Sequence, residues 1–316
     1  MNKKIFLFSG LVLLELTVIC YLLTRIVTSR NRFSYSVIDR QNLNMTASSG
    51  LKHFYEPVPN SIDKTNSWSL NQGINTINND ALNERFNYAV DKSKGTYRII
   101  TLGDSYTYGL YVDTKDNWTE KLENMLNTEL KCNNINKFEV INLAVYGYDF
   151  QYNLERYKKR GIKYQPDLIV WYITDPFRIT DQIIDLANKI TDELKKRNDI
   201  KKIDSYYPWN EAWRQIYNQY GSKEILNLQL SWLKKFHNLY QGPLVFMYSN
   251  ERIRVSLQHV FDKFLTGYYN KSGSLGISLT KQDHFPTDNH PNQTGHQKIA
   301  ETVFNYLIKD KLIPCH

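Results

Sequence analysis

The sequence predicts an α/β protein: a three-layer, flavodoxin-like parallel sheet of about five strands with helices on both faces, preceded by an N-terminal transmembrane helix. Two observations indicate this class. From about residue 96 onward, short apolar runs alternate with longer amphipathic segments, which is the pattern of parallel strands connected by helices. One of these runs, Leu168–Ile173, is apolar throughout, as is typical of a strand buried on both faces.

The predicted elements alternate along the chain. We expect strands at residues 98–102, 138–145, 168–173, 243–248 and 276–280. We expect helices at residues 115–131, 151–160, 179–197, 210–240, from about 250 to 265, and 292–308.

The N-terminal run at residues 5–24 is almost wholly apolar, with Lys3 and Lys4 before it and Arg25 after it. About 20 apolar residues suffice for a helix to span a bilayer. Glu15 interrupts the run at a cost of roughly 2–3 kcal/mol, which the remaining apolar side chains outweigh. Because no small-x-small cleavage site follows, we expect an uncleaved anchor rather than a signal peptide.

The chain therefore divides into three predicted parts. These are a transmembrane anchor at residues 1–27, a juxtamembrane linker with an N-terminal extension at 28–95, rich in Asn, Ser and Thr, and the main α/β domain at 96–316. Basic residues lie on both sides of the apolar run and leave its orientation open. We expect a membrane-anchored protein with its main domain on the extracytoplasmic side.

Composition limits the classes of binding partner that we expect. The formal net charge of +8 favours anionic partners such as lipid headgroups or acidic glycans. The basic residues are scattered, without zinc-finger spacing or an aromatic RNA-binding signature, so we expect no nucleic-acid partner. Three cysteines are too few for a disulfide framework. Cys132 and Cys315 could pair, but spacing alone does not decide it.

Polar segments follow three of the predicted strands. The first is Gly-Asp-Ser-Tyr-Thr-Tyr-Gly at residues 103–109, and the others follow Val145 and Ile173. Because the carboxyl ends of parallel strands meet at one edge of a sheet, these segments should converge there. A serine hydroxyl such as that of Ser105 needs a base to act as a nucleophile, and the C-terminal loop supplies Asp288 and His290.

The same blocks carry a family resemblance. Three blocks follow one another along the chain. They are Gly103-Asp104-Ser105 with Thr107 and Gly109, the block at residues 142–147 that ends in Gly147, and the run from Asp288 through His290-Pro291-Asn292 to His296. In these blocks the chain resembles the SGNH (GDSL-type) hydrolases, in particular bacterial membrane-tethered members. The resemblance covers roughly residue 97 to the C-terminus.

The resemblance implies roles for individual residues. Ser105 would be the nucleophile, His290 the base, and Asp288 the carboxylate that orients His290. The backbone amides of Ser105 and Gly147 would bind the oxyanion. No cofactor and no metal would be needed.

One position departs from the family's pattern. The third block normally presents an Asn-Asp pair, but here Thr174 occupies the Asn position before Asp175. Losing one oxyanion donor costs roughly 2.7–4 kcal/mol in the barrier. Thr174 could substitute directly as the oxyanion donor, another group such as Asn153 could replace it, or activity could be low.

The same residues have alternative interpretations that do not involve catalysis. Ser105 could be an ordinary helix N-cap, and Asp104 could brace the turn by binding backbone amides. His284, His290 and His296, with Asp283 and Asp288, could bind a metal, but their even spacing of six residues matches no familiar site. We expect His296 to be structural.

The predicted function is that of a serine esterase. It would cleave or transfer ester-linked acyl groups, acetyl in the first place, on a cell-envelope polysaccharide or lipid. The alternative is a catalytically weak or inactive protein of the same fold that binds glycans or serves in an assembly.

Overall fold

The computed structural model describes residues 43–45, 50–63, 71, 73–197, 207–286 and 288–315. The predicted transmembrane segment at residues 1–27 lies outside these residues. Within the described part of the chain, no helix combines the length and apolar character needed to cross a membrane. The anchor therefore stays a prediction.

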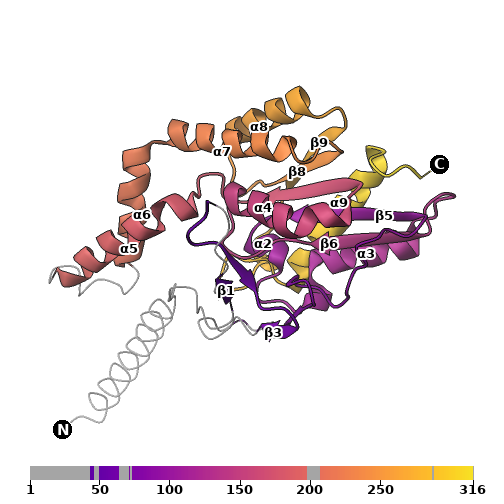
Figure 1. Cartoon of the computed structure of the whole chain (residues 1–316), viewed down its shortest axis with the longest axis horizontal. Helices are drawn as coiled ribbons and strands as arrows, with labels where there is room; N and C mark the ends of the chain where they lie inside the picture. Colours follow the sequence, from indigo (N-terminus) through magenta and orange to yellow (C-terminus); the bar gives the residue numbers. More distant parts are fainter. Residues whose placement is uncertain are drawn as a thin grey trace, which may run out of the picture.

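A five-stranded parallel sheet forms the centre of the molecule (Figure 1). Its strand order is β6-β5-β7-β8-β9, so the first of these strands along the chain lies inside the sheet and the second at an edge. This is the flavodoxin-like order, whose switch point lies between the first and third strands. The strands are β5 (Thr96–Leu102), β6 (Lys137–Asn142), β7 (Leu168–Ile173), β8 (Leu244–Ser249) and β9 (Ser272–Ile277).

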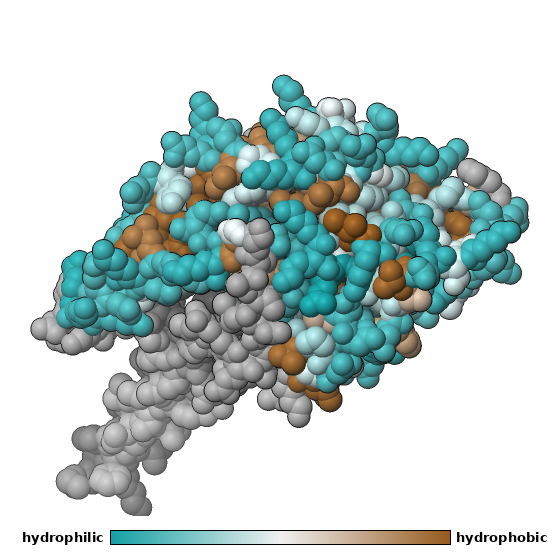
Figure 2. Space-filling model, in the orientation of Figure 1, coloured by the Kyte–Doolittle hydropathy of each residue, from teal (hydrophilic) through white to brown (hydrophobic). Residues whose placement is uncertain are grey.

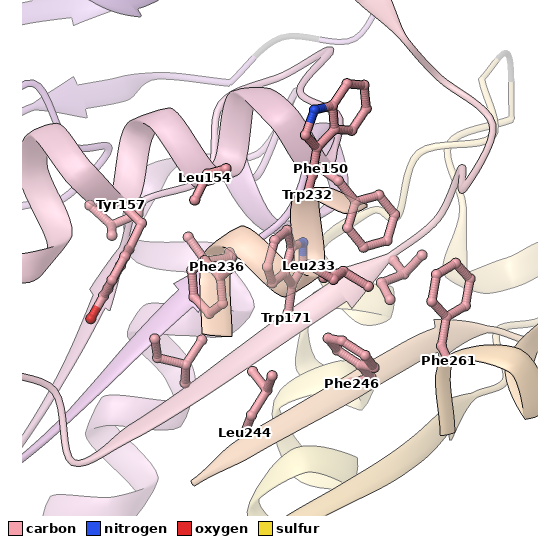
Figure 3. Close-up of a cluster of buried hydrophobic side chains, with 14 of the residues drawn as sticks. Phe150, Leu154, Tyr157, Trp171, Trp232, Leu233, Phe236, Leu244, Phe246 and Phe261 are labelled. Atoms are coloured by element: carbon pink, nitrogen blue, oxygen red, sulfur yellow. The ribbon is translucent and has the colours of Figure 1, made fainter. Parts of the chain in front are cut away.

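Alternate residues of each strand supply two separate cores, one on each face of the sheet. Ile100, Trp171 and Phe246 face the core formed with α4, α5, α6, α7 and α8 (Figure 3). Ile99 and Val170 face the opposite core, formed with α3 and α9. The helices are α3 (Trp118–Glu129), α4 (Phe150–Arg156), α5 (Thr180–Lys196), α6 (Tyr207–Tyr220), α7 (Ser222–His237), α8 (Val255–Tyr268) and α9 (Gln293–Lys309).

The predicted α/β class, with five parallel strands and helices on both faces, is confirmed. The strand predicted at 138–145 ends at Asn142, because its pairing with β5 ends where Asn142 lies opposite Thr101. Two further elements differ from the prediction. The helix expected at 210–240 is two helices, because Gly221 between them adopts a left-handed φ of 79° that breaks the helical path. The last strand lies at Ser272–Ile277 rather than 276–280, because backbone pairing with β8 aligns Ser272 with Leu244.

Helices α5 and α6 form an arm that projects from the sheet (Figure 1). The face shown in Figure 2 is mostly hydrophilic; one group of apolar residues lies over α5, α6 and α7, and smaller apolar patches lie elsewhere on this face. At the other end of the molecule, Cys132 and Cys315 form a disulfide, so the pairing that the spacing left open does occur. It connects the segment after α3 to the C-terminal tail.

Part of the predicted linker and extension packs on the loops at the sheet edge. It contains the strand pairs β1–β2 and β3–β4, formed by β1 (Leu43–Met45), β2 (Tyr55–Pro57), β3 (Ser61–Asp63) and β4 (Asn75–Ile77). Phe54, Tyr55 and Ile77 are buried in a third cluster with Val145 and other residues of those loops. At Gly73, a Cβ would lie 2.5 Å from the backbone carbon of Val112, so only glycine permits this approach.

Candidate active site

The first block forms a tight turn from β5 into the short helix α2 (Ser105–Tyr108). Gly103 leads the turn, where a Cβ would lie 2.4 Å from the hydroxyl oxygen of Thr107. Asp104 caps the helix, and its carboxylate accepts a hydrogen bond of 3.0 Å from the Tyr106 N–H, as predicted. Ser105 is the first helical residue, so its N–H has no partner within the helix.

Ser105, His290 and Asp288 form one hydrogen-bonded chain. The Nε2 of His290 lies 2.8 Å from the Oγ of Ser105. The Nδ1 of the same ring is hydrogen-bonded to Oδ1 of Asp288, which also accepts the His290 backbone N–H at 2.9 Å. The three residues are partly exposed among buried neighbours. The fold therefore brings together side chains from two blocks 185 residues apart in sequence.

Electrostatics favour an ionised Asp288. Burial alone would raise the pKa of this carboxyl, but the hydrogen bonds and charge of His290, together with the charge of Arg252, hold it below its ordinary value. An ionised Asp288 can stabilise a protonated His290.

Two tyrosines that we did not predict flank His290. The ring of Tyr106 lies 5.4 Å from the imidazole, and that of Tyr111 lies 5.3 Å away and perpendicular to it. Tyr111 has a φ of 73°, an uncommon conformation for a large side chain. Arg252 stacks on Tyr106 and donates a hydrogen bond of 3.1 Å to its hydroxyl. The only sequence signal for these residues was the density of tyrosine after Ser105.

Gly147 lies in a four-residue turn after β6. The Tyr148 N–H donates to the Val145 carbonyl at 3.2 Å, and Gly147 has a φ of 78°. Positive φ at the third residue is the mark of a type II turn and favours glycine. The turn's own hydrogen bond does not use the Gly147 N–H, so this group is available to an oxyanion.

Thr174, the third predicted oxyanion donor, is buried and donates its hydroxyl hydrogen to the carboxylate of Asp104. A hydroxyl has a single hydrogen, so in this arrangement Thr174 offers none to an oxyanion. The side-chain amide of Asn153, the other candidate, binds two backbone groups. Its Oδ1 accepts the Gly103 N–H at 3.0 Å, and its Nδ2 donates to the Asp149 carbonyl at 2.9 Å.

The other histidines of the C-terminal region lie apart from the serine. His284 places Nδ1 at 2.8 Å from the Thr280 carbonyl. His296 is fully buried and accepts the Trp118 N–H at 3.2 Å. Burial lowers the pKa of His296 to about 3. It is a neutral core residue, as predicted.

No family model and no curated protein matches the chain in sequence. Several solved structures are similar in fold. A two-domain esterase active on acetylated mannans has 13% identity and a TM-score of 0.39 over 69% of this chain and 50% of that one. A family two carbohydrate esterase from Cellvibrio japonicus has 12% identity and a TM-score of 0.38 over 69% and 62%.

The esterase EstA from Pseudoalteromonas sp. has 13% identity and a TM-score of 0.43 over 68% of this chain and 99% of that one. The chain thus spans half the length of the mannan esterase and nearly all of EstA. Likeness at this level carries no argument about chemistry, which depends on the chain's own residues. The sheet order and the meeting of Ser105 with Asp288 and His290 agree with the resemblance to SGNH-type hydrolases seen in the sequence blocks.

Proposed function

We propose that this protein is a serine esterase that cleaves or transfers ester-linked acyl groups. The observation that carries the proposal is the hydrogen-bonded chain from Ser105 through His290 to Asp288. A weak nucleophile, a base in contact with it and a carboxylate that orients the base are the parts that acyl transfer needs.

The reaction proceeds in two halves. Ser105 Oγ attacks the carbonyl carbon while its proton passes to His290 Nε2, and the N–H groups of Ser105 and Gly147 bind the oxyanion. The carbon–oxygen ester bond then breaks, and His290 gives its proton to the leaving alcohol. Water, or the hydroxyl of an acceptor, attacks the acyl-serine through the reverse proton transfers and regenerates Ser105.

A fluorophosphonate probe tests the nucleophile. We expect wild-type protein to be labelled and Ser105→Ala to remain unlabelled. Ser249→Ala is the matched control, because Ser249 is also a serine at the carboxyl end of a sheet strand but hydrogen-bonds to Glu251 instead of a histidine. Equal labelling of wild type and Ser105→Ala would contradict the proposal.

The substrate part of the proposal is an acylated carbohydrate or lipid of the cell envelope, with acetyl as the acyl group. It is supported by the family resemblance and by the apolar run at residues 5–24, which would anchor the protein with the site on the extracytoplasmic side. Acetate release from acetylated polysaccharides, compared with long-chain esters, tests the acyl group. Product analysis with an acceptor sugar separates transfer from hydrolysis.

A second function is favoured by Thr174. Because its hydroxyl is directed to Asp104, the oxyanion site lacks the side-chain donor predicted at this position. This supports a weakly active or inactive protein that binds glycans or serves in an assembly. Turnover of 4-nitrophenyl acetate that is lost in His290→Ala would exclude this alternative. Glycan binding without turnover would favour it.

A further inference from the structure

We infer that Tyr55 is a positioning residue of the active site, whose hydroxyl holds the Tyr146–Gly147 peptide in the orientation that presents the Gly147 N–H to the oxyanion. The inference rests on the proposed function and assigns part of the site to the segment before the catalytic domain. Tyr55 lies on β2, about 90 residues before Gly147 in sequence.

The hydroxyl of Tyr55 touches both residues of that peptide. It donates a hydrogen bond of 2.5 Å to the carbonyl of Tyr146. It also lies against Gly147, where a Cβ would be 2.5 Å from the hydroxyl oxygen. Tyr55 is 3% exposed, and Tyr148 and Tyr152 enclose its ring at centroid distances of 5.3 and 5.8 Å.

Peptide planarity connects this contact to the oxyanion donor. The Tyr146–Gly147 bond is trans, so its C=O and N–H point in opposite directions in one plane. A group that holds the Tyr146 carbonyl on one side therefore directs the Gly147 N–H to the other. The hydrogen bond also polarises the peptide and makes its N–H a stronger donor.

The turn itself has two competing forms. Types I and II differ chiefly by a rotation of the central peptide through roughly 150° or more, with little movement of the flanking residues. Here that peptide is Tyr146–Gly147, and the observed φ of Gly147 corresponds to type II. The Tyr55 hydroxyl binds the carbonyl only in the observed form. Losing it would let the peptide flip and remove the Gly147 N–H from the site.

The hydroxyl keeps its proton in this environment. Burial raises the pKa of Tyr55 well above its ordinary value; Arg178 opposes the shift, whereas Asp149 and Asp104 add to it. The group is a donor to Tyr146 throughout the pH range in which an esterase works. Its role does not depend on titration.

Tyr55→Phe tests the inference, because it keeps the ring and removes the hydroxyl. Tyr240→Phe is the matched control. Its buried hydroxyl also donates to a backbone carbonyl, that of Pro243 at 2.9 Å, but it lies before β8, at the end of the strand opposite the site. With 4-nitrophenyl acetate we expect kcat of Tyr55→Phe to fall at least about tenfold with KM nearly unchanged, since the lost interaction acts in the transition state. Tyr240→Phe should keep kcat within about twofold.

Gly147→Ala supplies a second test that does not depend on the folding of Tyr55→Phe. Its Cβ would press on the Tyr55 hydroxyl and disturb the same contact. In the double variant, the fold-loss of kcat should be smaller than the product of the fold-losses in the two single variants, because both substitutions act on the same peptide.

The outcomes are distinct. A wild type without Ser105-dependent turnover would overturn the proposed function and this inference with it. An active wild type with equal kcat in Tyr55→Phe, or equal losses in Tyr55→Phe and Tyr240→Phe, would overturn the inference alone.

Discussion

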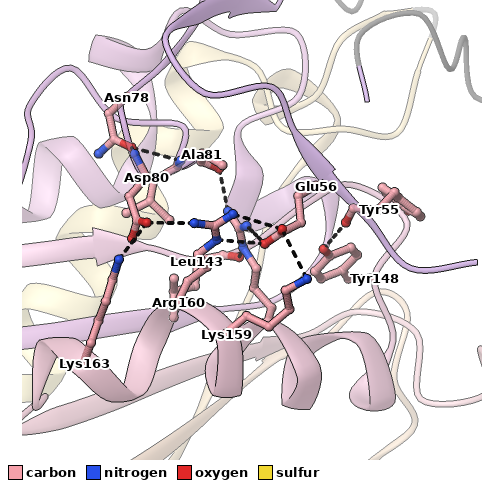
Figure 4. Close-up of polar contacts among 12 residues, drawn as sticks. Tyr55, Glu56, Asn78, Asp80, Ala81, Leu143, Tyr148, Lys159, Arg160 and Lys163 are labelled. Atoms are coloured by element: carbon pink, nitrogen blue, oxygen red, sulfur yellow. Dashed lines mark hydrogen bonds and ion pairs between the residues drawn. The ribbon is translucent and has the colours of Figure 1, made fainter. Parts of the chain in front are cut away.

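Two largely buried polar regions connect the described part of residues 50–95 to the rest of the chain, and they differ in how their carboxyl groups are paired with cations. In the ion-paired region, Glu56 and Asp80 meet Arg156, Arg160 and Lys163 (Figure 4). In the carboxylate cluster, Glu84, Glu120 and Glu123 lie close together with Arg85 and Tyr88. The first region pairs its anions with cations, and the second concentrates carboxyl groups.

The pKa values follow this difference. Burial alone would raise the pKa of Glu56, but Arg156 and Arg160 lower it to about 2. Burial raises the pKa of Glu123 to about 7, and Glu120 and Glu139 add to the shift. Burial also raises the pKa of Glu84, with Glu120 and Glu123 acting in the same direction. The neighbouring cations therefore keep a buried acid charged in one region, whereas burial without enough cations favours the neutral acid in the other.

Breaking the ion-paired region should have the largest effect. Arg156 is fully buried, pairs with Glu56, and donates to the carbonyls of Ala81 and Leu143. Arg156→Met would leave a buried carboxylate with fewer partners and should lower the free energy of unfolding by about 3–5 kcal/mol. Urea denaturation followed by tryptophan fluorescence measures it.

Arg160→Met is the control for Arg156→Met. The Arg160 side chain is 26% exposed and also contacts Glu56, so a smaller loss is expected. A loss below about 1 kcal/mol in Arg156→Met would show that the pair does not hold the segment in place.

Glu123→Gln tests the difference between the two regions through the pH dependence of stability. The folded pKa is raised, so the folded state binds more protons than the unfolded state between the ordinary value of 4.5 and about 7. Stability must then fall as pH rises through this window. The Gln variant lacks this titration, so its stability relative to wild type should increase from pH 4.5 to pH 8, by on the order of 3 kcal/mol.

Denaturation at several pH values measures this relative stability. Glu56 provides the comparison in wild type, because its folded pKa is lowered and its contribution is lost only as pH falls from 4.5 toward 2. A constant difference between Glu123→Gln and wild type across pH 4.5–8 would contradict the assignment.

The smallest effect is expected at the edge of the ion-paired region. Lys163 lies 2.7 Å from Asp80, but its side chain is 37% exposed. Lys163→Ala should cost only about 0.2–1 kcal/mol, and the loss should shrink as salt is added. Thermal unfolding at low and high ionic strength tests this, and a loss as large as that of Arg156→Met would remove the distinction between buried and exposed pairs.

The sequence by itself determined the features that arise from local pattern. The apolar run Leu168–Ile173 is a strand with the predicted bounds, because a strand buried on both faces needs continuous apolar residues. Ser105 lies at the carboxyl end of β5, where the block of small and polar residues indicated a turn. Asp288 and His290 could be selected as its partners because the chemistry of a serine nucleophile requires them.

Only the tertiary structure decided the features that depend on contacts between distant segments. The hydroxyl of Thr174 points to Asp104 rather than to an oxyanion, the disulfide joins Cys132 to Cys315, and Tyr55 reaches the turn at Gly147. The hydrogen-bond partner of a side chain depends on which residues the fold places beside it. The local periodicity of the sequence does not predict which residues these are. The family resemblance predicted that Thr174 occupies the position of an oxyanion donor. The packing of the loops determines that its hydroxyl hydrogen is donated to Asp104 instead.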